Sequence, residues 1–147
     1  FINAHLAAHQ HKVARRNSDV NEIMNGISRT LGKLKVDVMV QFDHVIFMGD
    51  LNYRLDYGNQ GEEKTPSIEQ FNQMVHKIEQ KKYDQLFSCD QLQLEKKKGR
   101  VFCGFKEGLY NFAPTFKVLR QKKLAYNHER SPSWCDRVLW HSLTKDW

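Results

Sequence analysis

The spacing of hydrophobic residues changes along this 147-residue chain and predicts an alternation of strands and helices. In the first stretch, FINAHLAA, apolar residues at every second position from Ile2 leave Asn3 and His5 on the opposite face, the period of a strand. Between residues 12 and 31, apolar residues recur at three- and four-residue steps, which predicts an amphipathic helix that Gly32 ends.

Further elements follow in the same alternation. The short apolar run DHVIFMGD, residues 43–50, is typical of a buried strand. Thr65 and Pro66 predict the N-cap and first turn of a second helix, whose apolar stripe runs from Ile68 to Ile78. The remaining predicted elements are a short helix at 83–87 and strands in RVFCGF, residues 100–105, and RVLW, residues 137–140. This order indicates an α/β or α+β fold.

The composition of the chain indicates a single globular domain with a basic surface. Hydrophobic residues make up 40% and charged residues 27% of the chain, close to globular averages. The net charge of +6 favours an anionic partner, which is a nucleic acid, an acidic lipid headgroup or a phosphorylated small molecule. Charge does not choose among these, because a solvated lysine-rich face or turn, such as EKKKGR at 95–100, explains it as well.

Cysteine usage and the apolar runs bear on the compartment. The three cysteines lie far apart and form no CxxC pair, which favours a reducing environment. No apolar run approaches the roughly 20 residues that span a bilayer, and residues 1–10 lack the features of a secretion signal. We therefore expect a cytoplasmic protein whose membrane contact, if it has one, is peripheral.

The polar cluster behind the 43–50 strand is the first candidate for chemistry. In an extended backbone Asp50 and Asn52 point the same way, and Gly49 leaves room for a ligand to approach. A carboxylate can orient a water molecule, and the neighbouring amide can donate to a phosphate oxygen. An Asx-type turn explains the same residues without any chemistry.

Other candidates lie at both ends of the chain. His5 can stabilise the charge that develops on a phosphoryl group, although an ordinary polar strand residue is the alternative. Lys117, Arg130 and Arg137 lie in segments that prolines stiffen and aromatic residues anchor. Cations held in this way are suited to a multiply phosphorylated ligand, whereas the alternative is side chains that extend from the core into solvent.

Taken in order, the motifs NAHLAAH, RRN, GDLNYRLD, FAPTFK and SPSWCDRVLW resemble the catalytic domain of the inositol polyphosphate 5-phosphatases, within the deoxyribonuclease-I-like endonuclease/exonuclease/phosphatase superfamily. The resemblance runs nearly end to end, and PTFK with SPSWCDR are its most specific parts. It implies a four-layered sandwich of two mixed β-sheets flanked by helices. It also implies Mg²⁺-dependent removal of the 5-phosphate from phosphoinositides such as phosphatidylinositol 4,5-bisphosphate, or from soluble inositol polyphosphates.

The resemblance also implies roles for single residues. On matching motif positions, Asp50 orients the attacking water, Asn52 holds the scissile phosphate and His5 stabilises its developing charge. The implied substrate contacts are cationic: Lys117 and Arg130 at the positions that grip the 4-phosphate, with Arg137 and Arg54 as further candidates. Arg54 and Arg16 brace the site through ion pairs in the alternative interpretation.

This chain departs from the family pattern at several positions. Phe116 stands where relatives often carry Tyr, and His128 where a second cation is common, so the preference for a 4-phosphate is open. The stretch 57–66 is longer than is usual. The principal Mg²⁺-binding Glu of the family is expected upstream of residue 1, so no metal ligand is assigned within this chain.

The edges of the chain predict an incomplete domain. Phe1 begins inside a predicted strand, and the chain stops just behind the apolar run of RVLW. We expect residues 1–147 to be the central and C-terminal-proximal part of one catalytic domain, incomplete at both ends and inactive alone. The expected partners are a phosphoinositide or inositol polyphosphate substrate and a membrane surface, without nucleic acid. Two alternatives stay open, namely a nuclease of the same superfamily and a catalytically inactive phosphoinositide-binding module.

Overall fold

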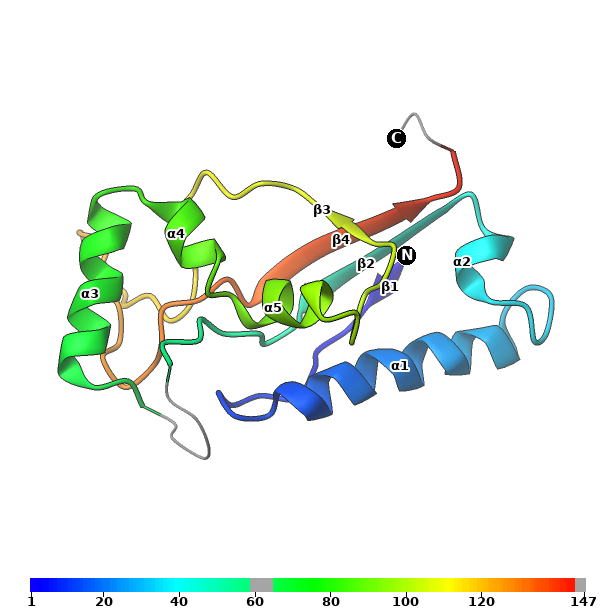
Figure 1. The fold of residues 1–147 in the computed structure, drawn as a ribbon, viewed down its shortest axis with the longest axis horizontal. Helices are drawn as coiled ribbons and strands as arrows, with labels where there is room; N and C mark the ends of the chain where they lie inside the picture. Colours follow the sequence, from blue (N-terminus) through cyan, green and yellow to red (C-terminus); the bar gives the residue numbers. More distant parts are fainter. Residues whose placement is uncertain (59–64, 145–147) are drawn as a thin grey trace.

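The computed structural model describes residues 1–58 and 65–144, and its centre is a mixed four-stranded sheet (Figure 1). The strands are β1 (Ile2–Asn3), β2 (His44–Asp50), β3 (Lys106–Glu107) and β4 (Asp136–Ser142), in the spatial order β1-β2-β4-β3. β1 runs parallel to β2, whereas β4 is antiparallel to both β2 and β3. The expected α/β class is confirmed, with one sheet among the described residues.

The described part also contains five helices: α1 (Val13–Thr30), α2 (Val38–Gln41), α3 (Ile68–Glu79), α4 (Tyr83–Phe87) and α5 (Gln91–Lys97). α1 and α5 lie along the strands, while α3 and α4 lie beyond the end where β2 finishes and β4 begins (Figure 1). The helices expected at 12–31 and 83–87 are confirmed. None of these helices is long and apolar enough to cross a membrane.

The N-cap of the second predicted helix, α3, lies two residues later than expected. Ser67, rather than Thr65, is the N-cap of α3, because its Oγ accepts a hydrogen bond from the Gln70 backbone N at 3.2 Å while the Gln70 side chain accepts one from the Ser67 backbone N at 2.9 Å. This reciprocal pair satisfies two backbone donors at once, which a cap at Thr65 does not.

The strand expected in RVFCGF is wrong. Phe102 and Gly104 have φ values of 51° and 79°, in the left-handed region that interrupts a strand. The chain turns there and buries Val101, Phe102 and Phe105, and only Lys106–Glu107 pair with β4. The expected strand in RVLW is confirmed within β4. Helices α2 and α5 were not predicted, and EKKKGR forms the end of α5 and the turn after it.

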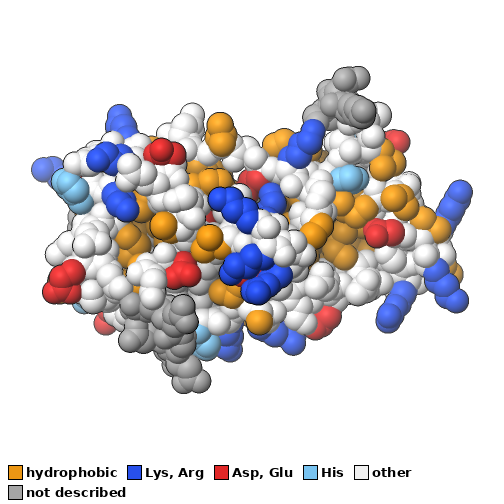
Figure 2. Space-filling model, viewed as in Figure 1, with side chains coloured by type: hydrophobic (Ala, Val, Ile, Leu, Met, Phe, Trp, Pro, Cys, Tyr) orange, Lys and Arg blue, Asp and Glu red, His pale blue; other side chains and the backbone are white. Residues whose placement is uncertain are grey.

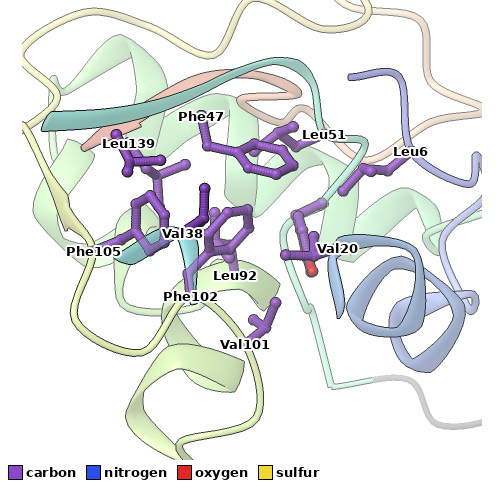
Figure 3. Packing of buried hydrophobic residues seen from close by; sticks show 12 residues of the cluster. Leu6, Val20, Val38, Phe47, Leu51, Leu92, Val101, Phe102, Phe105 and Leu139 are labelled. Atoms are coloured by element: carbon purple, nitrogen blue, oxygen red, sulfur yellow. The ribbon is translucent and has the colours of Figure 1, made fainter. Parts of the chain in front are cut away.

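One face of the sheet packs against α1, α2, α5 and the 101–105 turn (Figure 3). Phe47 and Leu139, neighbours across β2 and β4, are fully buried and face Phe102 in this core. The core consists of Leu6, Val20, Val38, Val45, Phe47, Leu51, Tyr53, Leu92, Val101, Phe102, Phe105 and Leu139. Burial of this apolar area is the main favourable term in folding.

The other face of the sheet is more open. Ile46, Met48 and Trp140 are half-buried, and Val138 is 54% exposed. Charges are spread over the molecule: Figure 2 shows lysine and arginine side chains over the middle of the visible face and at both of its ends, with acidic side chains between them. A second apolar cluster, from α3, α4 and the segment that includes Trp134, supports the end of the molecule beyond β2.

Candidate active site

The candidate site lies where the parallel pair β1 and β2 ends. The chain after β1 continues beside β2, since the backbone N of Ala4 donates to Met48 O at 2.9 Å and that of Leu6 donates to Asp50 O at 3.0 Å. This register brings His5 Nε2 to 3.5 Å from Asp50 Oδ2. The His5 side chain is 73% exposed and that of Asp50 36% exposed, so the pair faces solvent and is accessible to a ligand.

Gly49 is required by the backbone rather than by a ligand. Its φ is +128°, and a Cβ at this position lies 2.1 Å from the carbonyl oxygen of Ala4. The expectation that Gly49 makes room for a ligand is therefore corrected: it lets the chain after β1 approach β2 closely. That approach is what sets His5 beside Asp50.

Asn52 departs from the expected geometry. Its φ is +58°, so the chain is not extended here, and the prediction that Asp50 and Asn52 share a face by strand alternation is wrong. The Asn52 backbone N donates to Asp50 Oδ1 at 3.1 Å, which makes the alternative Asx-type turn real. Asn52 is 3% exposed, and its Nδ2 donates to Leu6 O at 3.0 Å, beneath the segment that carries His5.

Arg54 links Asn52 to the downstream segment. Its Nη2 donates to Asn52 Oδ1 at 2.7 Å, its Nε donates to Asn52 O at 3.0 Å, and its Cζ lies 4.1 Å from the centroid of the Phe116 ring. The pKa of Arg54 is lowered, chiefly because the side chain is buried. The positive charge of Arg130 also lowers this pKa, whereas Cys135 and Asp50 raise it. Arg54 is buried, so its described contacts are those of a positioning residue rather than of an exposed substrate contact.

The two cationic segments are joined to each other and to the site. Phe116 and Ser133 exchange backbone hydrogen bonds of 3.0 and 2.9 Å, and the Leu55 backbone N donates to Ser133 Oγ at 3.0 Å. These bonds attach both segments to the chain that follows Asn52. Lys117 and Arg130 remain exposed on them, as a charged ligand requires.

Arg137 does not belong to this surface. Its side chain is fully buried, with Nη1 and Nη2 at 2.9 and 3.0 Å from the Asp90 carboxylate and Nε at 2.7 Å from Glu107 Oε1. Burial favours loss of the charge, but Asp90 and Glu107 outweigh it and raise the pKa of Arg137. The expectation of a substrate contact is corrected, because the strand period that buries Leu139 places Arg137 on the same core face.

Within residues 1–58 and 65–144, Arg16 braces the site through hydrogen bonds rather than an ion pair. It is buried and donates to Ala7 O at 3.0 Å, His9 O at 2.7 Å and Gln91 Oε1 at 2.7 Å, so it holds the loop that follows His5. Gln91 Oε1 also accepts from the Arg54 backbone N at 2.9 Å.

Gln91 was not predicted as a site residue. It is a glutamine at the start of α5, and no motif marks it. Its part in the site depends on contacts with distant segments.

The described residues alone do not form a metal centre. Across 1–58 and 65–144, no three or more His, Cys, Asp or Glu side chains are grouped so that they could hold a metal ion. Mg²⁺ requires near-octahedral oxygen coordination, and the carboxylate of Asp50 with its neighbour His5 supplies only part of that set. Residues 59–64, within the long stretch expected at 57–66, lie outside the described residues.

The three cysteines are free thiols. Cys89 and Cys103 are exposed, whereas Cys135 is buried beside Tyr53 O, and burial raises the pKa of its thiol to about 12. Cys135 therefore stays protonated at neutral pH. It is a structural residue, one position before β4 begins.

Two curated proteins are similar to nearly the whole of this chain. It is 37% identical over 157 residues to "Type IV inositol polyphosphate 5-phosphatase 9" of Arabidopsis thaliana, covering 96% of this chain and 34% of the relative. It is 34% identical over 154 residues to "Phosphatidylinositol 3,4,5-trisphosphate 5-phosphatase 2" of Sus scrofa, covering 97% of this chain and 11% of the relative. The chain thus spans about a third of the length of the first relative and about a tenth of the second.

A solved structure shares the fold. The inositol polyphosphate 5-phosphatase domain of SPsynaptojanin, crystallised with inositol (1,4)-bisphosphate and a calcium ion, matches with a TM-score of 0.73 and 27% identity, over 96% of this chain and 38% of that one. The family model described as "Endonuclease/Exonuclease/phosphatase family 2" matches residues 1–146. With nearly every residue inside that match, this chain belongs to the endonuclease/exonuclease/phosphatase family 2.

Proposed function

We propose that the full-length protein carrying this chain is an inositol polyphosphate 5-phosphatase. Its substrates are phosphoinositides such as phosphatidylinositol 4,5-bisphosphate, soluble inositol polyphosphates, or both. The supporting observation is the pair of His5 Nε2 and Asp50 Oδ2, 3.5 Å apart on an open surface, with exposed Lys117 and Arg130 on segments bonded to the same part of the chain. The names of the relatives agree with this choice of reaction.

In this proposal Asp50, His5 and Asn52 have different roles in the reaction. Asp50 orients the attacking water and draws its proton, because a carboxylate on an open surface can accept both roles. His5 donates to the phosphoryl oxygens as their negative charge grows. Asn52 is pinned through Leu6 O and Arg54, and its amide has a second hydrogen with which to hold the scissile phosphate.

Lys117 and Arg130 bind the neighbouring 4-phosphate. Both side chains are exposed cations, and the bonds between Phe116 and Ser133 set the separation of their segments before any ligand arrives. Preorganised cations of this kind bind a phosphate with less loss of conformational freedom. Phe116 carries no hydroxyl and instead lies beneath Arg54, so the grip on the 4-phosphate depends on these two charges.

We also propose Mg²⁺ as the cofactor, with its principal Glu ligand outside the described residues. When bound, it supplies positive charge to the phosphate oxygens. The roles of His5, Asp50 and Asn52 are assigned without a step at the metal, since the described residues do not form its site.

The proposed whole domain is a four-layered sandwich, of which residues 1–147 form the central and C-terminal-proximal part. A second sheet then covers the open face that carries Met48 and Val138. The chain's share of its relatives, 34% in the Arabidopsis protein, supports this arrangement. The protein acts in the cytoplasm and meets its lipid substrate by peripheral contact with the membrane, and the 147 residues alone lack activity.

The test uses the full-length protein. Phosphate release from phosphatidylinositol 4,5-bisphosphate and cleavage of DNA are compared with Mg²⁺ and with EDTA. We expect release of phosphate, its loss in EDTA and no cleavage of DNA. Cleavage of DNA without phosphate release indicates the nuclease, and lipid binding without either reaction indicates an inactive binding module.

Two variants test the role of the site. Asp50→Asn is expected to lower kcat by at least about a hundredfold, the usual contribution of a positioned acid or base. Asp43→Asn, which changes an exposed aspartate before β2, is the matched control and is expected to retain activity. Full activity of Asp50→Asn contradicts the role given to Asp50.

A further inference from the structure

A short hairpin projects from the substrate side of the candidate site. The Lys117 carbonyl accepts a hydrogen bond from the Asn127 backbone N, and the Leu119 backbone N donates to Ala125 O, both at 2.9 Å. Residues 120–124 form the exposed tip of this docking hairpin, which comprises residues 117–127. It lies at the α3 end of the molecule, in the orange part of the chain (Figure 1).

The side chains of the docking hairpin combine exposed leucines with cations. Leu119 is 41% and Leu124 58% exposed. The cations between them are Arg120, Lys122 and Lys123, all exposed. No aspartate or glutamate occurs from residue 108 to residue 128, so the hairpin itself carries no acidic side chain to offset these charges.

This combination selects one kind of partner. Lysine and arginine are attracted to anionic headgroups, while leucines on the same tip lose contact with water when they enter the boundary between headgroups and acyl chains. A nucleic acid uses the cations but leaves both leucines in water. The hairpin chemistry therefore fits an anionic bilayer better than a polyanion.

The hairpin is also continuous with the residues of the site. It begins at Lys117, directly after Phe116, whose ring lies under the guanidinium that holds Asn52. A bilayer bound at the tip therefore lies against the same short hairpin that carries Lys117, the residue proposed to bind the 4-phosphate.

We propose that the docking hairpin binds anionic lipid bilayers and orients the site toward lipid headgroups. The orienting role rests on the proposed function, whereas the binding does not. The docking hairpin is then the surface that makes the peripheral membrane contact. Residues 119–124 of this hairpin are separate from the groups proposed to act on the substrate.

The binding test uses the full-length protein and co-sedimentation with vesicles that contain no phosphoinositide. Wild type is expected to bind vesicles of phosphatidylcholine with phosphatidylserine and not those of phosphatidylcholine alone. Arg120→Gln/Lys122→Gln/Lys123→Gln should weaken binding roughly a hundredfold, at about fivefold per cation. Leu119→Ser/Leu124→Ser should weaken it by about tenfold through lost apolar contact.

The control changes the same residue types at the other end of the molecule. Lys33→Gln/Leu34→Ser alters an exposed lysine and a leucine that is 65% exposed, in the loop before α2 (Figure 1). It is expected to bind vesicles like wild type. Equal binding by the hairpin variants and wild type overturns the proposal, as does an equal loss in the control or a hairpin-dependent affinity for DNA with no affinity for vesicles.

A second measurement separates docking from catalysis. The hairpin variants are expected to lose hydrolysis of phosphatidylinositol 4,5-bisphosphate in phosphatidylserine vesicles while they keep hydrolysis of soluble inositol 1,4,5-trisphosphate. Equal loss on both substrates refutes the orienting role. If the wild type hydrolyses neither substrate but binds the vesicles through the hairpin, the proposed function fails and the docking surface stands.

Discussion

Asp90→Ala is expected to destabilise the full-length protein by about 4 kcal/mol, because it unpairs a charge in the core. Asp90 is fully buried, and its two carboxylate oxygens accept from Arg137 at 2.9 and 3.0 Å. The same carboxylate caps α5, accepting from the Gln93 backbone N at 3.0 Å. It therefore joins β4 to the helix that begins with Gln91, a member of the site's supporting contacts.

The magnitude follows from these two roles. Removal of one partner of a buried ion pair costs about 3–5 kcal/mol, and the lower end applies here because Glu107 stays bound to Arg137. Loss of an N-cap adds about 1 kcal/mol. The two contributions together give the expected value.

Urea denaturation of the full-length protein, followed by fluorescence, measures this loss. Asp37→Ala is the matched control, because Asp37 caps α2 through the Met39 backbone N at 2.8 Å but is exposed and pairs with no buried charge. It should cost about 1 kcal/mol or less. Asp90→Asn keeps a capping oxygen and should fall between the two. Equal destabilisation by Asp90→Ala and Asp37→Ala refutes the reasoning.

Three further predictions concern the backbone, a thiol and pH. Gly49→Ala should lower the free energy of unfolding in urea by at least about 2 kcal/mol and lower activity, because the new Cβ meets Ala4 O. Gly26→Ala, where a Cβ has no neighbour within 4 Å, is the control and should change neither. Unchanged stability of Gly49→Ala contradicts the role of Gly49 in the close approach of the two chain segments. Of the three thiols in residues 1–147, iodoacetamide should label Cys89 and Cys103 in the folded protein and all three in urea, because Cys135 is buried and its pKa is raised to about 12. Peptide mapping by mass spectrometry locates the label, and rapid labelling of Cys135 in the folded protein contradicts this. Burial by itself raises the pKa of Glu95, but hydrogen bonds from Asn17 and Lys98 and the charges of Lys98 and Arg100 outweigh burial, so the pKa is lowered. The Glu95 carboxylate therefore stabilises the folded state fully above the ordinary pKa near 4.5, and this contribution is lost as pH falls through the lowered pKa of the folded state. The stability gap between wild type and Glu95→Gln should shrink between pH 6 and pH 3, and a constant gap refutes the assignment.

Local patterns accounted for much of the fold. The helical period predicted α1, and the apolar runs predicted β2 and the middle of β4, since these elements bury one face or run against the core. The pattern failed in RVFCGF, where apolar side chains enter the core from a turn with positive φ values rather than from a strand. Apolar content alone does not distinguish these two backbones.

The candidate site was predictable in its chemistry but not in its geometry. His5 and Asp50 were chosen from motifs, and the register of β1 and β2 brought them to 3.5 Å. Arg54 and Arg137 were chosen as candidate substrate contacts, with bracing of the site as the alternative for Arg54, and both are buried. The residue type alone does not show whether an arginine forms a buried salt bridge or contacts a ligand at the surface. Only the residues that surround it in the folded protein distinguish the two roles.

The sequence by itself determined the features that depend on neighbouring residues. These are the amphipathic helices, the helix N-cap to within two residues and the motifs that carry His5, Asp50 and Lys117. Tertiary structure alone decided which polar groups meet. Gln91 joins Arg16 to the backbone of Arg54 across the fold, and Asp90 neutralises Arg137 in the core. The physical reason is that a buried donor or charge must find a partner, and distant segments supply that partner only once the chain has folded.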